Sequence, residues 1–280
     1  MKKRLYVFLL LIPLVLGGCS TQFVYNNIDW LIHWYLDEYI DLTQSQKKQF
    51  DGKMQLWLNW HRESELKRYR AQLTELKQAL NEQLITPELW LHHARQARQH
   101  WFRFRKTLSP DLLELAMAVD DEQVEAFFAA LEQEIQEWQQ ERAELSPEEL
   151  LKQRAKKITD RIKPWTGKLT REQKQLIANY SQEHASGFQA FIQYRRHWQK
   201  EAKELLLNRQ NRNFAPSFLQ LLTDPERLRS PELKQILAAN RHLMAQLMTE
   251  LHASLTAKQK RRLNHKLNDL IEDLNELQEE

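Results

Sequence analysis

The 280-residue sequence predicts an all-α protein, an elongated bundle of about eight to ten helices. Only three glycines, Gly52, Gly167 and Gly187, follow residue 18, whereas sheet proteins need many glycine-bearing turns. The good helix formers Leu, Gln, Glu, Lys, Arg and Ala dominate the composition instead. Apolar residues also recur every three or four positions, the spacing of one helix face, and no segment is confidently a strand.

The chain begins with MKKRLYVFLLLIPLVLGGCS, which has the order of a secretory signal. Three basic residues, 2–4, precede an apolar run over 5–16 that is too short to span a bilayer comfortably. The run ends in LGGC, which is similar to the bacterial lipobox. That resemblance implies cleavage before Cys19 and attachment of a diacylglycerol and an N-acyl chain to this cysteine. Ser20 stands where Asp favours inner-membrane retention in similar lipoproteins, which indicates the periplasmic face of the outer membrane.

Three segments follow from this start: a cleaved signal peptide over 1–18, a lipidated cysteine and short tether over 19–25, and a single helical domain over 26–280. Two helical halves meeting near 163–168 are an alternative. Cys19 is the only cysteine, so the chain can form no internal disulfide and keeps no thiol for catalysis or metal binding. Cleavage removes three of 41 basic residues and none of 38 acidic ones. The neutral mature chain argues against nucleic-acid binding.

Several helix starts are marked by proline. In five places Pro follows Ser, Thr or Asp and precedes an acidic residue. The first side chain can cap a helix, Pro suits the first helical position, and the acid complements the helix dipole. The predicted starts are Thr86-Pro87, Ser109-Pro110, Ser146-Pro147, Asp224-Pro225 and Ser230-Pro231.

The helix bodies are predicted by apolar stripes at helical spacing. The segment NRQNRN over 208–213 interrupts them and is the best interior loop candidate. In chain order the stripes run from Leu66 to Leu84, Trp90 to Leu108, Val124 to Trp138, Ile177 to Leu205, Leu233 to Leu251 and Leu263 to Leu277.

One phrase, L-T-x-x-Q-K, occurs three times, at 42–47, 169–174 and 255–260. With Thr as N-cap, Gln falls at the third helical position, and the two side chains can form a capping box. The next position holds Lys rather than the apolar residue of a hydrophobic staple, and a functional role would require these lysines to share one surface. The predicted boxes are Thr43 with Gln46, Thr170 with Gln173, Thr256 with Gln259 and, more loosely, Asp120 with Gln123; the lysines are Lys47, Lys174 and Lys260.

Two resemblances accompany these motifs. The LTxxQ phrase resembles that of Spy/CpxP-type periplasmic proteins, small helical chaperones and envelope-stress regulators, but only over nine residues at a time. The stretch FVYNNIDWLIHWYLDEYIDLTQSQ resembles the opening of an uncharacterised gammaproteobacterial lipoprotein family, a domain of unknown function. This second resemblance implies no established activity.

The aromatic residues after the anchor have two interpretations. Trp30, Trp34 and Tyr35 could contact lipid headgroups, where Trp and Tyr are favoured. Packing in the core is preferred, because most apolar stripes face a core.

The stretches 95–106 (RQARQHWFRFRK) and 194–198 (YRRHW) mix arginines with aromatics. They could hold anionic lipid, lipopolysaccharide or glycan phosphate, but a solvated basic face over buried rings is preferred because the mature chain is neutral. Histidine is the best catalytic or metal candidate: His61 and His184 lie on apolar stripes, and three more lie close together in the sequence, His92, His93 and His100. Without an H-E-x-x-H or E-x-x-H motif, no catalytic, metal-binding or cofactor-binding residue is assigned.

The expected function is therefore that of a lipid-anchored, non-enzymatic binding or scaffold protein of the cell envelope. Its expected partners are the inner leaflet of the outer membrane, the lipoprotein processing and sorting machinery, and an unidentified envelope protein. No cofactor is expected beyond the acyl chains on Cys19. The alternatives are a periplasmic holdase-type chaperone or envelope-stress protein, and a hydrolase of envelope glycan or lipid.

Overall fold

The computed structural model describes residues 24–82 and 85–279, and Cys19 and the predicted signal peptide lie outside these ranges. The described residues form eleven α-helices, so the all-α class is confirmed and the predicted count of eight to ten is slightly low. The helices are α2 (Ile28–Leu36), α3 (Gln44–Trp60), α4 (Leu66–Glu82), α5 (Pro87–Met117), α6 (Asp121–Ala143), α7 (Pro147–Thr166), α8 (Arg171–Glu183), α9 (Phe188–Leu207), α10 (Phe214–Thr223), α11 (Pro231–Ala253) and α12 (Ala257–Glu279).

Two short elements complete the chain. The π-helix η3 (His61–Glu65) joins α3 to α4, so that one continuous helix runs along the molecule. The 3₁₀ helix η4 (Pro225–Leu228) precedes α11.

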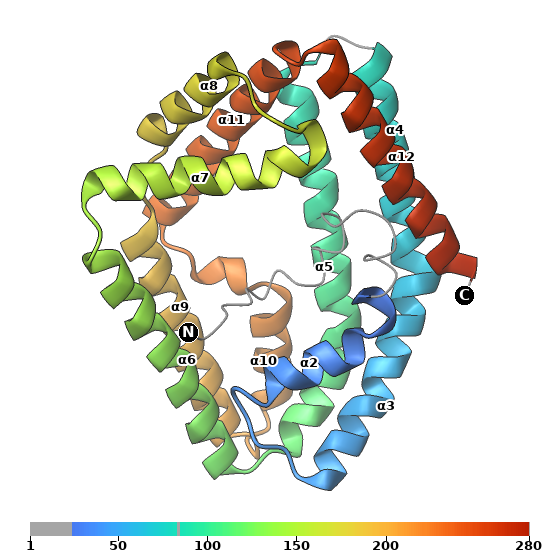
Figure 1. The fold of residues 1–280 in the computed structure, drawn as a ribbon. Coiled ribbons are helices and arrows are strands. Elements are labelled where there is room, and N and C mark those ends of the chain that lie inside the picture. Colours follow the sequence, from blue (N-terminus) through green and yellow to red (C-terminus); the bar gives the residue numbers. More distant parts are fainter. Residues whose placement is uncertain (1–23, 83–84, 280) are drawn as a thin grey trace.

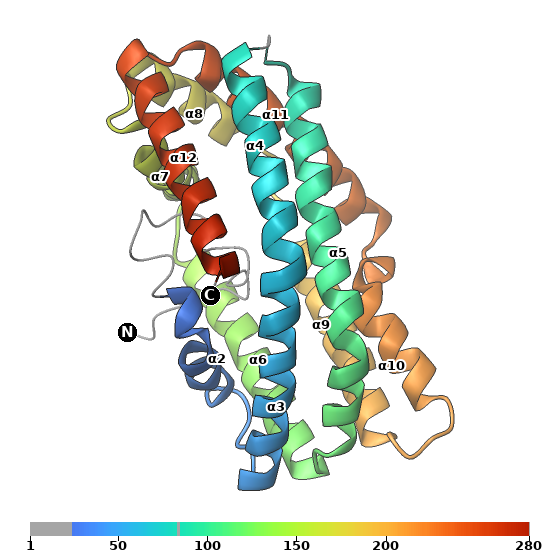
Figure 2. The same ribbon diagram turned by 90° about the vertical axis from the view of Figure 1, so that its right-hand side faces the viewer.

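The helices form an elongated frame (Figure 1). One long side consists of α3, α4, α5 and α12, and the other of α6 and α9. Helices α7, α8 and α11 meet at one end, while α2 and α10 lie near the other. The view turned by 90° shows α3, α4 and α5 along the long axis (Figure 2). Direct packing of α4 on α12, α5 on α10 and α11, and α6 on α9 holds the frame together.

The hydrophobic core is divided among four clusters, as an elongated frame requires. The largest joins α6, α9 and α10, and includes Phe128, Ala202 and Leu221. A second lies where the π-helix meets the end of α12. The remaining two lie between α7, α8 and α11, and between α4, α12 and the start of α5.

Most proline-marked starts are confirmed. Helices α5, α7 and α11 begin at Pro87, Pro147 and Pro231, and Pro225 starts the 3₁₀ helix. The start predicted at Ser109-Pro110 is wrong, because α5 continues through Pro110. There the Ser109 hydroxyl donates to the Arg105 carbonyl at 2.5 Å, within the helix, instead of capping a new one.

The stripe from Ile177 to Leu205 is another correction, since it belongs to two helices, α8 and α9. The chain leaves the helical conformation at His184 and resumes it after Gly187. A side chain at Gly187 would meet Ile236 of α11 at 3.1 Å, so this turn depends on close approach to α11. The loop predicted at 208–213 is confirmed between α9 and α10.

All four predicted capping boxes are present. Each N-cap side chain accepts from the backbone N–H of the glutamine three residues later, and that glutamine accepts from the N-cap N–H. The boxes also form two pairs, which the sequence did not indicate. Gln46 and Gln123 donate to each other at 2.9 and 2.8 Å, joining the starts of α3 and α6. Gln173 and Gln259 do the same at 2.9 Å in both directions, joining α8 and α12.

The second amide hydrogen of each glutamine follows one rule. It is donated to the backbone carbonyl two residues before the N-cap of the partner helix. The acceptors are Ala118 for Gln46, Asp41 for Gln123, Ser254 for Gln173 and Lys168 for Gln259, at 2.7–3.1 Å. Each pair therefore closes a local two-fold junction in which every amide hydrogen has an acceptor.

The recurrent lysines do not share one surface. The α3–α6 junction and the α8–α12 junction lie at opposite ends of the frame (Figure 1). Lys47, at the first junction, lies 3.4 Å from Asp37, whereas Lys174 and Lys260 are exposed at the other end. The repeated phrase is therefore a device for starting and pairing helices.

Candidate ligand pocket

A cavity of about 260 Å³ lies between the start of α3, the end of α5, and helices α6, α9 and α10. Leu36, at the end of α2, and Ile40 close one side of it. Its walls are almost wholly aliphatic and aromatic, with Gln46 and Gln49 as the amide side chains. The remaining lining residues are Leu42, Phe50, Leu112, Leu115, Ala116, Ala118, Val119, Val124, Phe127, Phe128, Trp198, Ala202, Leu206, Phe218 and Leu222.

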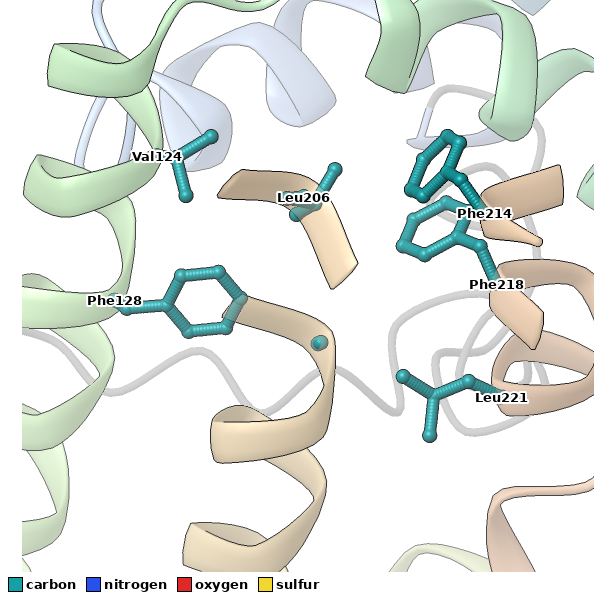
Figure 3. Close-up of a cluster of buried hydrophobic side chains, with 7 residues drawn as sticks. Val124, Phe128, Leu206, Phe214, Phe218 and Leu221 are labelled. Carbon is teal, nitrogen blue, oxygen red and sulfur yellow. The ribbon is translucent and has the colours of Figure 1, made fainter. Parts of the chain in front are cut away.

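The deep wall of this pocket belongs to the largest core cluster (Figure 3). Val124 and Phe128 project from α6, and Phe218 projects from α10 on the other side. Leu206 of α9 lies between them. Because these side chains come from three helices, the pocket is a property of the assembled frame.

Helix α2 has a different character on its two sides. Leu36 faces the pocket, whereas Trp30 and Trp34 are 68% and 40% exposed. The expectation that these two tryptophans pack in the core is wrong, because the core contacts of this segment are made by Tyr25 and Ile28. Tyr25, the last residue of the predicted tether over 19–25, is buried in the packed body.

Tyr35 is half-buried and donates to the Tyr39 hydroxyl at 3.1 Å. Burial, and then this hydrogen bond, raise the pKa of Tyr35 above its ordinary value. Tyr39 in turn lies against Phe127 of the pocket wall, with 6.3 Å between ring centroids. These contacts connect the end of α2 to the pocket.

A second candidate is the buried polar network at the π-helix. His61 Nδ1 lies 3.0 Å from the Tyr25 hydroxyl, and Nε2 lies 3.3 Å from the Tyr69 hydroxyl. A neutral imidazole can satisfy both tyrosines, donating to one and accepting from the other. Burial lowers the pKa of His61 to about 4, so the neutral form is held at neutral pH.

Glu65, one turn further along, is completely buried and accepts from two side chains of α5. His100 Nδ1 lies 2.9 Å from one carboxylate oxygen, and Arg103 Nε donates to the other at 2.7 Å. Burial opposes ionisation of Glu65, but these hydrogen bonds and the charge of Arg103 prevail and lower its pKa to about 2. His100 Nε2 completes the chain at 2.8 Å from the Gln72 side-chain oxygen.

This network fastens the π-helix to the N-terminal segment and to α5. Insertions of π-helix are frequent at functional sites, yet the polar atoms of His61, Glu65 and His100 are engaged with other protein groups. Of the histidines singled out in the sequence, His61 and His100 are brought together on either side of Tyr69, whereas His184 lies elsewhere, at the end of α8 against Tyr180. Within residues 24–82 and 85–279, no three His, Cys, Asp or Glu side chains are grouped as metal ligands.

The two arginine-rich stretches are more ordered than a solvated basic face. Arg103 and Arg105 form ion pairs with Glu65 and Glu226. On α9, Arg195 pairs with Glu134 at 3.2 Å and lies over the ring of Trp138. The sequence pattern could not predict these ion pairs, because the partners lie far apart in the chain.

The fold and the pocket define an all-helical protein with an apolar pocket between its helices. A family model matches residues 38–234, and the chain belongs to that family, a family of unknown function (DUF6279). No curated protein and no solved structure matches the chain. Among the described helices, none is long and apolar enough to cross a membrane.

Proposed function

We propose that this protein is a lipoprotein of the periplasmic face of the outer membrane, anchored through Cys19, that binds a hydrocarbon chain in the pocket bounded by α2, α5, α6, α9 and α10. Membership of a gammaproteobacterial lipoprotein family, with a signal peptide over 1–18, belongs to the same proposal.

The observation that carries the binding proposal is an apolar cavity of about 260 Å³. A cavity of about 150 Å³ lined by Leu, Ile and Phe stays dry and binds small apolar molecules. A hydrocarbon chain that enters this partly open pocket removes the apolar walls from water, which stabilises the complex by about 25 cal/mol per Å² of apolar surface buried.

The position of α2 supports the proposal that the hydrocarbon chain reaches the pocket from a membrane. Trp30 and Trp34 are exposed about a dozen residues after the predicted anchor, and Trp is favoured at the headgroup level. Leu36, on the same helix, contributes to the pocket wall. One short helix thus has a face suited to lipid headgroups and a face toward the apolar pocket.

The test uses the full chain purified in a non-ionic detergent and incubated with oleic acid, with bound acid detected by native mass spectrometry. Ala202 lines the pocket and is 1% exposed, so Ala202→Phe should fill the space and abolish the adduct. Ala129→Phe, on the exposed side of α6, is the matched control and should keep it. Equal adducts in wild type and a folded Ala202→Phe would refute the proposal, and circular dichroism would establish that the variant is folded.

A further inference from the structure

An apolar groove of about 390 Å³ lies between α8, α11 and the start of α9. Its floor includes Leu233, which is 1% exposed, and Gly187, where an added Cβ atom would lie 3.1 Å from Ile236. Phe191 forms part of the wall and is 39% exposed. The groove therefore holds recessed apolar side chains beside one accessible aromatic ring.

The groove follows α11 for about three turns. Its lining residues on this helix recur at helical spacing and are Leu233, Ile236, Leu237, Asn240, Arg241 and Met244. At 1.5 Å per residue, the first and the last of them are about 16 Å apart along the helix axis. A helical segment of about 11 residues has the same length and repeats its own apolar side chains every three or four positions. Grooves of this kind bind the apolar face of an amphipathic helix.

The rim of the groove is positively charged. Arg241 is part of the wall and is exposed, so its guanidinium is accessible to a ligand in the groove. The Arg142 guanidinium lies 4.7 Å from the ring centroid of Phe188, which also lines the groove. Arg154 donates to the carbonyl of His184, another lining residue, at 3.3 Å. Among the described residues that line the groove, none is acidic.

These arginines have no acidic partners. Arg142, Arg154 and Arg241 form no ion pair in the part of the chain that the structure describes. Burial, and more weakly the charge of Arg142, lower the pKa of Arg154. Burial, and then the charges of Arg98 and Arg229, lower the pKa of Arg241. By contrast, two arginines further along α9 each reach a carboxylate of α6, at 3.2 and 2.6 Å. The groove thus has a local excess of positive charge that acidic groups of a partner would complement.

We propose that this groove binds an acidic amphipathic helix of a partner protein. The apolar face of that helix packs against Phe191 and Leu237, and its acidic residues lie beside Arg241 and Arg142. A second copy of this chain fits less well, because a two-fold dimer would bring two positive grooves face to face. A membrane fits less well, because it takes up protruding apolar side chains, whereas most of these are recessed. The groove shares no lining residue with the pocket that contains Ala202, so the inference is independent of the proposed function.

The test measures peptide binding by fluorescence anisotropy. The full chain is held in nanodiscs of dioleoylphosphatidylcholine, and protein-free nanodiscs give the blank. The probe is a labelled synthetic helix of about 15 residues, with Leu at every third or fourth position and Glu on the opposite face. A matched peptide carries Lys in place of Glu. The acidic peptide should bind at least about tenfold more tightly than the basic one, and high salt should reduce the difference.

Two variants, each with a matched control, identify the groove as the binding site. Arg241→Glu should weaken binding of the acidic peptide about tenfold and strengthen binding of the basic one. Lys174→Glu makes the same change of charge at an exposed position near the start of α8 and should alter neither affinity. Phe191→Ala should also weaken binding of the acidic peptide, whereas Leu56→Ala, at a side chain of α3 that is 61% exposed, should not. Circular dichroism establishes that each variant is folded.

Three results would overturn the proposal. The first is equal affinity for the acidic and basic peptides, or an unaltered affinity in folded Arg241→Glu. The second is an adduct with dioleoylphosphatidylglycerol in native mass spectrometry that Arg241→Glu abolishes, without binding of the acidic peptide, which would assign the groove to a lipid. The third is a dimer in sedimentation velocity that Phe191→Ala dissociates, which would assign the groove to a second copy of the chain.

Discussion

His61 should make the stability of this fold depend on pH in the mildly acidic range. Its pKa is about 4 in the folded protein, against an ordinary value of 6.5, because the imidazole is buried between Tyr25 and Tyr69. Above pH 6.5 both the folded and the unfolded states hold neutral His61. As the pH falls below 6.5, His61 binds a proton in the unfolded chain but stays neutral in the folded protein until the pH approaches 4. The free energy of unfolding must therefore decrease on acidification.

The magnitude follows from the size of the shift. One pKa unit corresponds to about 1.4 kcal/mol. The free energy of unfolding should therefore fall by about 3 kcal/mol between pH 6.5 and pH 4. Glu65 has its lowered pKa near 2, and its contribution is lost only as the pH falls below its ordinary value of 4.5. Between pH 7 and 5 the His61 contribution can thus be measured without that of Glu65. It should be about 2 kcal/mol over this interval.

Urea unfolding of the full chain in detergent, followed by tryptophan fluorescence at pH 7, 6 and 5, measures this effect. His61→Phe keeps a ring against Tyr69 but cannot titrate, so its unfolding free energy should fall by about 2 kcal/mol less than that of wild type. Other buried histidines titrate in both proteins and cancel in the difference. His265→Gln, at a side chain that is 77% exposed, is the control and should follow wild type. Parallel pH profiles for wild type and His61→Phe would refute the reasoning.

Three further predictions concern the junctions, the anchor and α2. Gln46→Ala removes two donated hydrogen bonds and half of a capping box, and should lower the free energy of unfolding by about 2 kcal/mol in urea titrations, whereas Gln44→Ala at the exposed first position should have little effect. Cys19→Ala should release the protein from the membrane fraction, and continued sedimentation with membranes would contradict the lipoprotein proposal. Replacing both Trp30 and Trp34 by Ala should leave the circular dichroism spectrum intact but weaken liposome contact of the unlipidated protein; loss of folded signal would instead mean that these side chains support the fold.

Local signals predicted the helix starts well because each depends on a few contiguous residues. A capping box needs only Thr43 and Gln46, and its geometry is set before any distant contact forms. The pairing of Gln46 with Gln123 depends instead on which helix starts meet, and a single sequence holds no such information. For the same reason the sequence could not show that Glu65 would meet Arg103.

The mistaken predictions show where tertiary context prevails over local signals. Ser109-Pro110 has the letters of a helix start, but packing of α5 against α10 and α11 sustains one long helix through it. The apolar stripe of α8 continues in phase into α9, so periodicity alone did not reveal the turn at Gly187. The sequence alone could not predict the pocket, because its walls come from helices that are far apart in the chain.

The paired junctions also explain how a glutamine can line an apolar pocket. Gln46 is part of the pocket wall, yet its amide group donates both hydrogens, to Gln123 and to the Ala118 carbonyl. Its oxygen accepts from the Thr43 N–H and from Gln123. With its donors and its acceptor engaged, the side chain presents little unsatisfied polarity to an apolar ligand. The α8–α12 junction satisfies its glutamines in the same way without bordering this pocket, so helix pairing is the role that the repeated phrase serves at both ends, and ligand contact is confined to the α3–α6 junction.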